Sequence, residues 1–292
     1  LNSLMMISNV FLLLTRSMAS GARILEVIDE KVDLTDEKVR NIEVERGSVD
    51  FEHVWFKYKK EAKEYVLSDI SFHIEAGQTV GVIGQTGAAK STLVQLIPRL
   101  YDATEGVVKV DGVPVQEYPM AHLREAIAMV LQKNTLFSGS LLDNLRWGKE
   151  DASMEEIEEA CRIACVDEVL ERLPEGYETE MGQGGVNVSG GQKQRICIAR
   201  ALLKKPKILI LDDSTSAVDT ATEAKIRERM GAALPDMTKI IIGQRISSVR
   251  HADQIIILDD GRVSAIGTHE ELLARSEIYQ QIYESQKEGV EL

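Results

Sequence analysis

The sequence has few cysteines and little positive charge, and each shortage excludes a class of protein. Its 292 residues include only three cysteines, Cys161, Cys165 and Cys197, an odd set that indicates neither a disulfide framework nor a zinc site. We predict buried, reduced thiols, with a redox pair as the alternative. Asp and Glu number 47 against 34 Lys and Arg, for a formal net charge of -13. Because nucleic-acid binders need a basic surface to release counterions, we expect no nucleic-acid partner.

An uninterrupted hydrophobic run long enough to span a membrane is also missing. Residues 1–14 are largely apolar, but a spanning helix needs roughly 20 residues, and Arg16 and Arg23 follow. A secretory signal carries its charge before the apolar run, so we predict instead that residues 1–28 are the truncated end of a transmembrane helix. The two arginines would then mark the cytoplasmic side. An amphipathic helix of a soluble core is the alternative.

The composition that remains is typical of a globular α/β protein. Hydrophobic residues make up 44% and charged residues 28% of the chain, and its length is enough for one large domain with a buried core. The stretch 29–47 is dense in charge and poor in large apolar residues, which predicts a linker. We therefore expect the folded domain over residues 48–288.

Hydrophobic periodicity predicts both strands and helices beyond the linker. Short apolar or aromatic-rich runs favour strands, whereas helical spacing, with a capping box at Ser153 and Glu156, favours helices. Strands are expected over 49–58, 66–74, 79–83, 208–211, 239–242 and 254–258, and helices over 120–128, 153–173, 192–203 and 268–283. The last three apolar runs suit buried parallel strands covered by helices on both faces. An α/β core with a helical insertion follows.

A glycine-rich loop connects the strand predicted at 79–83 to an apolar helix. It consists of Gly84, Gln85, Thr86, Gly87, Ala88, Ala89, Lys90, Ser91 and Thr92. Backbone N–H groups would cradle nucleotide phosphates, Lys90 would reach the β and γ groups, and the Ser91 hydroxyl would bind Mg²⁺. Ala89 replaces the glycine usual before the lysine, and since alanine is comfortable at negative φ we expect binding to survive. A chance glycine turn is the alternative.

Paired acids end the buried strand predicted at 208–211. Asp212 and Asp213 follow this strand directly, which places Asp212 where a carboxylate can hold Mg²⁺ through water. Acids at a strand end are also common as solvated caps. A phosphate loop in the same domain favours the metal-binding interpretation.

The segment 188–195 carries the most specific motif of the chain. Ser189, Gly190, Gly191 and Gln192 stand just before a predicted helix, and they resemble the signature of ABC ATPases. In that family the signature of one subunit closes over the γ-phosphate held by the phosphate loop of another, so ATP joins a head-to-tail dimer. The resemblance, over 49–284, implies an α/β P-loop NTPase of the ABC ATPase type, with a RecA-like core, an antiparallel β subdomain and an α-helical subdomain at about 133–204.

Other residues resemble further elements of the family. Tyr58 is similar to the aromatic that stacks on adenine, and Val66 is placed with it among the ATP-binding residues. Gln132 matches the glutamine that touches Mg²⁺ and water beside the contact with the membrane domain. Residues 216–219 resemble the D-loop, and 179–185 resemble the loop of exporters that meets the coupling helices. The resemblance extends to the N-terminal segment, which is similar to the end of the sixth transmembrane helix.

Two positions depart from the family at the catalytic site. Asp213 stands where a glutamate normally acts as general base, and one methylene less withdraws the carboxylate from the attacking water. Gln244 stands where a histidine normally contacts the γ-phosphate, and it cannot become cationic. With Gln132 these are the candidate catalytic residues, and the site is expected to hydrolyse slowly. The pattern resembles the degenerate-site subunit of a heterodimeric, multidrug-type exporter.

The resemblance therefore implies a second half-transporter subunit as partner, with glutamate and histidine at these two positions. The implied cofactors are ATP and Mg²⁺, and the implied location is the cell membrane, with the ATPase domain on the cytoplasmic side. A homodimeric exporter and a nucleotide-binding regulatory module without transport are the alternatives. A soluble ABC ATPase of DNA repair or translation is disfavoured, because it needs a coiled-coil insertion or a second cassette. Drug, lipid and peptide cargo remain open.

Overall fold

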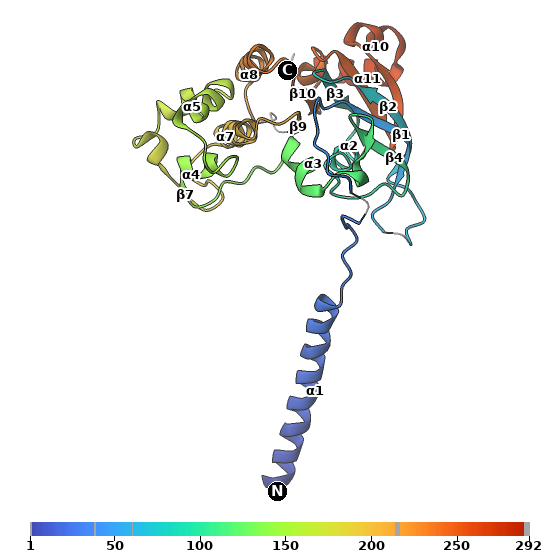
Figure 1. The fold of residues 1–292 in the computed structure, drawn as a ribbon, viewed down its shortest axis with the longest axis vertical. Coiled ribbons are helices and arrows are strands. Elements are labelled where there is room, and N and C mark those ends of the chain that lie inside the picture. The colour runs from blue at the N-terminus through green and yellow to red at the C-terminus, as the bar shows by residue number, and fades with distance from the viewer. Residues whose placement is uncertain (1, 38, 60, 214–216, 289–292) are drawn as a thin grey trace. The chain divides into compact units, whose positions relative to one another are not determined.

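The computed structural model describes residues 2–37, 39–59, 61–213 and 217–288. Within it the chain divides into two compact units, residues 1–37 and residues 38–292. The first unit is built on one helix, and the second carries the three sheets (Figure 1).

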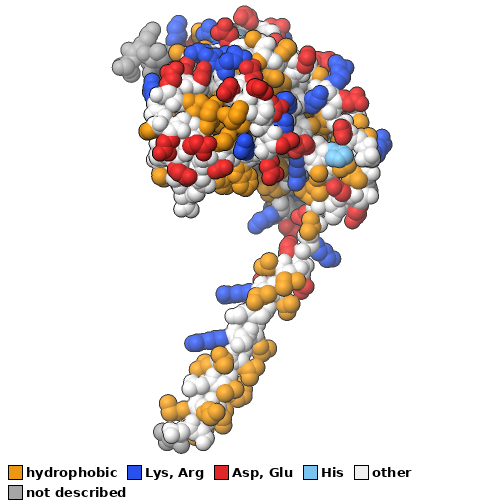
Figure 2. Space-filling view, turned by 60° about the vertical axis from the view of Figure 1, so that its left-hand side comes forward, with side chains coloured by type: hydrophobic (Ala, Val, Ile, Leu, Met, Phe, Trp, Pro, Cys, Tyr) orange, Lys and Arg blue, Asp and Glu red, His pale blue; other side chains and the backbone are white. Residues whose placement is uncertain are grey.

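The first unit consists of helix α1, Asn2–Ile28, which the sequence predicted. None of its residues is buried, and large apolar side chains such as Phe11 are 67% exposed. Figure 2 shows hydrophobic side chains along much of this helix. At 27 residues, α1 is long and apolar enough to cross a membrane by length and composition.

The core of the second unit is a six-stranded sheet in the order β12-β11-β3-β10-β9-β6. The five strands from β11 to β6 run parallel, and β12 returns antiparallel beside β11. Their apolar runs are buried because helices cover both faces of a parallel sheet. The strands are β3 Thr79–Ile83, β6 Ile127–Val130, β9 Ile208–Asp212, β10 Thr238–Ile242, β11 Gln254–Asp259 and β12 Arg262–Gly267.

A second, antiparallel sheet has the order β2-β1-β4-β5. Its buried face shares one hydrophobic cluster with the parallel sheet and the helix after β3, so that Phe51 and Ile70 pack with Val80 and Leu93. The strands are β1 Val49–Phe56, β2 Leu67–Ile74, β4 Glu105–Val110 and β5 Val113–Pro114.

A helical region lies between β6 and β9 in the chain and shares a second hydrophobic cluster with β6, β9 and α8. It contains α4 Leu141–Arg146, α5 Met154–Ile163, α6 Asp167–Leu170 and α7 Gly190–Leu203, with the short pair β7 Gly139–Ser140 and β8 Glu180–Met181. The remaining helices are α2 Lys90–Gln95, α3 Met120–Ala126, α8 Thr220–Ala233, α9 Ile246–Val249, α10 His269–Arg275 and α11 Glu277–Glu288, and two 3₁₀ turns cover Val115–Glu117 and Gly176–Glu178.

Three predicted helices are wrong in extent. The one predicted over 120–128 ends at Ala126, because the next four residues pair with β9 as strand β6. The one over 153–173 is broken after Ala164, where Cys165 adopts a left-handed conformation with φ 57°. The one over 268–283 is two helices, because Ser276 between them is extended.

The three cysteines are buried and free, as predicted. Burial is also the main reason that the pKa of the Cys161 thiol rises to about 12. Since the reactive species is the thiolate, this cysteine is chemically inert at neutral pH.

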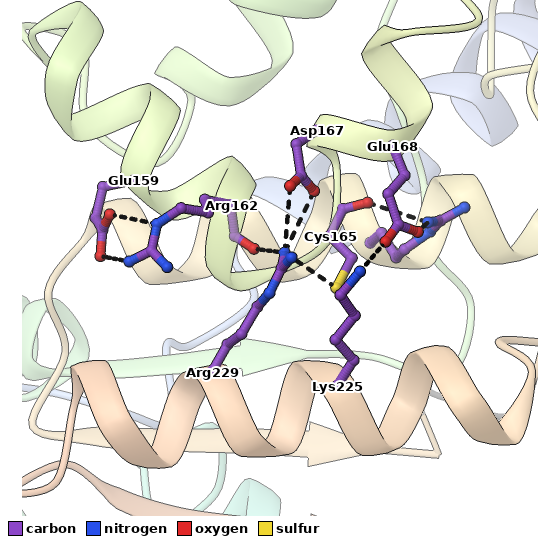
Figure 3. A network of polar contacts seen from close by, with 8 residues as sticks. Glu159, Arg162, Cys165, Asp167, Glu168, Lys225 and Arg229 are labelled. Carbon is purple, nitrogen blue, oxygen red and sulfur yellow. Dashed lines mark hydrogen bonds and ion pairs between the residues drawn. The ribbon is translucent and has the colours of Figure 1, made fainter.

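Helix α8 is tied to the helical region by a polar network (Figure 3). Arg229 of α8 donates to the Arg162 carbonyl, and its Nη1 lies 3.3 Å from an Asp167 carboxylate oxygen. One turn earlier, Lys225 pairs with Glu168. The network joins the helix that follows β9 to the turn between α5 and α6.

Candidate functional site

The glycine-rich loop runs from the carboxyl end of β3 to the start of α2. A Cβ at Gly84 would meet the Leu258 carbonyl oxygen at 2.1 Å, so only glycine fits there. Gly87 has φ 89°. Ala89, the N-cap of α2, is also left-handed, with φ 68°. This corrects our expectation of a negative φ at Ala89 and explains why glycine is usual at this position, since a Cβ disfavours the left-handed region.

Lys90 and Ser91 begin α2 and turn their side chains to different partners. Lys90 Nζ donates to the Gly84 carbonyl at 2.8 Å and to the Gln85 carbonyl at 2.9 Å, so the ammonium closes over the loop. Burial lowers the pKa of Lys90, and the neighbouring aspartates only partly oppose this effect. The Ser91 hydroxyl hydrogen-bonds to the Asp212 carboxylate.

A cavity of about 360 Å³ opens beside the loop. It is formed at the carboxyl edge of four neighbouring parallel strands, which is where open α/β sheets bind ligands. The residues that line it come from segments far apart in the chain: Val66, Thr86, Gly87, Ala89, Lys90, Ser91, Thr92, Gln132, Asp212, Asp213, Ile242 and Gln244. Ile242 is the member that the sequence analysis missed, because an apolar residue at a strand end gives no chemical signal.

Asp213 is the centre of the polar contacts in this cavity. Its Oδ2 accepts hydrogen bonds from Gln132 Nε2 at 3.2 Å and from Gln244 Nε2 at 2.9 Å. The backbone of Asp213 is left-handed, with φ 47°, and its N–H donates to the Ile242 carbonyl. The three candidate catalytic residues are therefore in direct contact, which their sequence separation did not reveal.

Burial raises the pKa values of both paired acids. For Asp213 the adjacent Asp212 raises the pKa further, whereas Lys90 and the Gln244 amide lower it. For Asp212 the Ser91 hydrogen bond and Lys90 oppose the effect of burial on the pKa. Two carboxylates and the two amides that bond to Asp213 thus share a small volume with one ammonium group and the Ser91 hydroxyl.

Four of the predicted ATP-binding residues lie outside the cavity wall. Ala88 is 4% exposed and packs beneath the loop. Gly84 and Gln85 supply the carbonyls that hold Lys90. Tyr58 is 51% exposed, and its hydroxyl lies 2.8 Å from Thr92 Oγ1, next to the cavity.

The signature residues do not line this cavity. Ser189 caps α7 by accepting from the Gln192 N–H, and the Gln192 side chain accepts from the Ser189 N–H at 2.8 Å. A Cβ at Gly191 would meet the Ala217 carbonyl oxygen at 2.7 Å, so close packing alone demands a glycine here. Of the predicted D-loop, Ser216 lies outside the described residues.

A Mg²⁺ ion implied by the resemblance would need hard oxygen ligands. Ser91, Asp212 and Gln132 all line the cavity, and they offer a hydroxyl, a carboxylate and an amide oxygen. Since Mg²⁺ keeps several waters and takes few protein ligands beside a phosphate, this donor set fits the ion. Among the described residues there is no cluster of three His, Cys, Asp or Glu side chains that could bind a metal without such help.

Comparison with known proteins identifies the family and the fold. The sequence model of the family described as ABC transporter matches residues 67–216, from β2 to the segment after the paired acids. The chain belongs to the ABC transporter family. The predicted fold, an ABC ATPase domain with a parallel and an antiparallel sheet after an N-terminal helix, is confirmed.

Curated ABC relatives match almost the whole chain. An uncharacterized ABC transporter ATP-binding protein of Bacillus subtilis, YfiB, is 46% identical over 291 residues, which is 99% of this chain and 50% of that protein. The putative multidrug export ATP-binding/permease protein YgaD of the same organism is 43% identical over 92% of this chain and 47% of its own length. The ATP-dependent lipid A-core flippase of Legionella pneumophila is 38% identical over 94% of this chain and 46% of its own length.

A solved ABC structure agrees with this assignment. The structure of a bacterial Atm1-family ABC exporter with ATP bound superposes with a TM-score of 0.88 at 35% sequence identity, over 94% of this chain and 48% of that one. The chain thus spans about half the length of the relatives that it matches.

Proposed function

We propose that this chain is the ATP-binding and ATP-hydrolysing part of an ABC exporter. The observation that carries the proposal is the cavity at the carboxyl edge of the parallel sheet, where Lys90, Ser91 and Asp212 meet the Gln132, Asp213 and Gln244 cluster. The match to the ABC transporter family over residues 67–216 supports it.

The residues in and beside the cavity have distinct roles in this proposal. The loop N–H groups and Lys90 bind the phosphates, and Tyr58 offers its exposed ring to the adenine. Ser91, Asp212 and Gln132 would hold Mg²⁺, which would neutralise charge on the phosphates. The ammonium of Lys90 exchanges its two loop carbonyls for phosphate oxygens, which as charged acceptors bind it more strongly.

Hydrolysis at this site is expected to be slow because of Asp213. Its carboxylate is one methylene shorter than a glutamate and accepts from two amides, which hold it back from an attacking water. Gln244 can donate a hydrogen bond but cannot shuttle a proton. The site would therefore bind Mg-ATP firmly and turn it over slowly.

The signature would act on a different nucleotide. Ser189 and Gly190 are exposed and do not line the chain's own cavity, as expected for a surface that closes on a second subunit. We propose a heterodimer in which this signature completes the partner's site. The partner would carry glutamate and histidine at the positions of Asp213 and Gln244.

The chain would work at the cell membrane, with its ATPase domain on the cytoplasmic side. The support is α1, which is apolar and unburied over 27 residues and carries Arg16 and Arg23 towards its carboxyl end. The names of the relatives, which include export and permease proteins, favour the same arrangement. A transmembrane domain with coupling helices is the implied partner within the transporter.

The test is to restore the two catalytic residues. The double variant Asp213→Glu with Gln244→His should raise steady-state ATP turnover by about 100-fold over the unmodified chain, since a placed general base contributes about 10² to 10⁴ in rate. Turnover is measured as phosphate release at high protein concentration, so that two copies can supply signatures to each other. Lys90→Ala in the same double variant is the control and should abolish the gain. Fast turnover by the unmodified chain alone would contradict the slow-site assignment.

A further inference from the structure

The C-terminal helix α11 reaches the nucleotide cavity through one side chain. The Gln286 amide Nε2 donates to the Gln244 carbonyl at 2.7 Å, and its Oε1 accepts from the Ile246 N–H at 2.8 Å. Both halves of one amide thus hold the backbone of the loop between β10 and α9. Gln286 lies 42 residues after Gln244 in the chain.

Helix α11 is firmly seated where it makes this contact. Tyr279 is fully buried, and its hydroxyl lies 2.7 Å from His269 Nδ1. Around it, one hydrophobic cluster includes Ile83, the last residue of the strand before the phosphate loop, and Ile246. Gln286 follows Tyr279 by two helical turns and so lies on the same face of α11. The packing of α11 around Tyr279 therefore fixes the position from which the Gln286 amide reaches the loop.

The contacts continue from this loop to the reacting end of the site. The backbone of Gln244 is held by Gln286, and its side chain donates to Asp213 Oδ2 at 2.9 Å. Gln132 donates to the same oxygen. Because a side chain can hold a fixed position only if its own backbone is held, Gln286 determines how precisely Gln244 meets Asp213.

We propose that Gln286 is a positioning residue of the nucleotide site, acting through Gln244. Gln286 itself does not line the cavity, and its amide bonds to the backbone of Gln244 and Ile246 rather than to Asp213, so it is not a catalytic residue. Its effect on nucleotide binding rests on the proposed function, whereas its effect on the loop does not. Two measurements on the full chain in detergent distinguish the effect on the loop from the effect on nucleotide binding.

The first measurement is amide hydrogen exchange at Ile246. Gln286→Ala removes the acceptor of this N–H, so exchange should accelerate by about 10-fold or more. Gln280→Ala is the matched control, since Gln280 on the same helix donates to the Leu273 carbonyl at 2.6 Å and has no contact with the loop. It should leave Ile246 unchanged. Equal protection of Ile246 in the unmodified chain and in Gln286→Ala would overturn the proposal.

The second measurement is the affinity for a fluorescent ATP analogue with Mg²⁺. Gln286→Ala should weaken binding by about threefold to tenfold, which corresponds to one disturbed hydrogen bond, and Gln280→Ala should not. In a Gln244→Ala background the same Gln286→Ala change should have no further effect, because the side chain through which it acts is gone. An effect of Gln286→Ala that persists in this background shows a general structural role and overturns the proposal. Absence of binding by the unmodified chain would instead reject the proposed function, while the exchange result still tests the loop contact.

Discussion

Two non-glycine residues of the nucleotide cavity, Ala89 and Asp213, have left-handed backbones, with φ of 68° and 47°. Such conformations cost about 1 kcal/mol or more for residues with a Cβ and tend to cluster at functional sites. Ala89 joins the phosphate loop to α2, and Asp213 directs its carboxylate to Gln132 and Gln244. At the scale of single residues, two of the nine non-glycine residues with positive φ in the described part of the chain therefore lie where the ligand is expected.

Replacing Ala89 by glycine should stabilise the protein. The change removes the cost of a left-handed alanine, which raises the free energy of unfolding. The greater freedom of the unfolded chain lowers it by less, so we expect a net rise of about 0.5–1 kcal/mol. Urea denaturation measures it. Ala88→Gly is the control, because Ala88 is buried and not left-handed, and it should lower the free energy of unfolding by about 1 kcal/mol. A loss of stability in Ala89→Gly equal to that of the control would argue against the left-handed loop.

At the scale of elements, two hairpins share a two-residue Asp-Gly turn. Asp111 and Gly112 join β4 to β5 with φ of 50° and 76°, and Asp260 and Gly261 join β11 to β12 with φ of 43° and 71°. Two consecutive positive φ values are typical of a type I′ turn, which matches the twist of the strands. The sequence analysis predicted none of β4, β5 and β12, although Asp-Gly between apolar runs was a usable signal.

The Asp111 side chain also binds a neighbouring segment of backbone. Its carboxylate accepts hydrogen bonds of 2.8–2.9 Å from four consecutive backbone N–H groups, those of residues 45–48. Burial by itself would raise the pKa of Asp111, but these donors outweigh burial and lower the pKa. The turn thus holds the chain just before β1, at the end of the segment that we predicted as a linker.

Asp111→Asn should therefore destabilise the protein in a pH-dependent way. The loss at pH 7 is expected to be about 1–2 kcal/mol, since hydrogen bonds to a charged group are weakened. A depressed pKa in the folded state means that the unfolded state binds the proton more readily. The charge of Asp111 thus stabilises the fold above the ordinary Asp pKa, and this contribution is lost as the pH falls through the lower folded-state pKa. Urea denaturation at several pH values measures the difference, and Asp260→Asn, at an exposed turn, should change little. A difference that is constant with pH would contradict the assignment.

At the scale of the second unit, the network in Figure 3 links helix α8 to the helical region between β6 and β9. Glu168 accepts from Lys225 of α8 and from Arg195 of α7, the helix that the signature begins. Gln194 of α7 also accepts from the Ala217 N–H, just before α8. Helix α7 is therefore joined to α8 through Glu168 and to the segment before α8 through Gln194.

Arg229→Ala should loosen this connection. Arg229 is only 22% exposed at its side chain and contacts both the Arg162 carbonyl and Asp167, so its loss should lower the free energy of unfolding by about 1–2 kcal/mol. Hydrogen exchange of the amides at residues 162–168 should also become faster. The matched control is Arg162→Ala, which breaks an exposed pair with Glu159 and should cost less than about 0.5 kcal/mol. An equal loss of unfolding free energy in the two variants would show that the Arg229 contacts stabilise the protein no more than an exposed ion pair does.

The sequence by itself determined the phosphate loop, the paired acids, the signature and the family, because each depends on residues that are adjacent in the chain. It also determined most strands of the parallel sheet and the capping box at Ser153 and Glu156, for the same reason. Only the tertiary structure decided that 127–130 is a strand, since pairing with β9 overrides its helical pattern. The contacts of Asp213 with Gln132 and Gln244, and of Gln286 with Gln244, likewise depend on the order of the strands in the sheet. Spacing in the sequence carries no record of that order, because it is set by packing between distant segments such as β3 and β10, whose paired residues Thr79 and Lys239 are 160 positions apart.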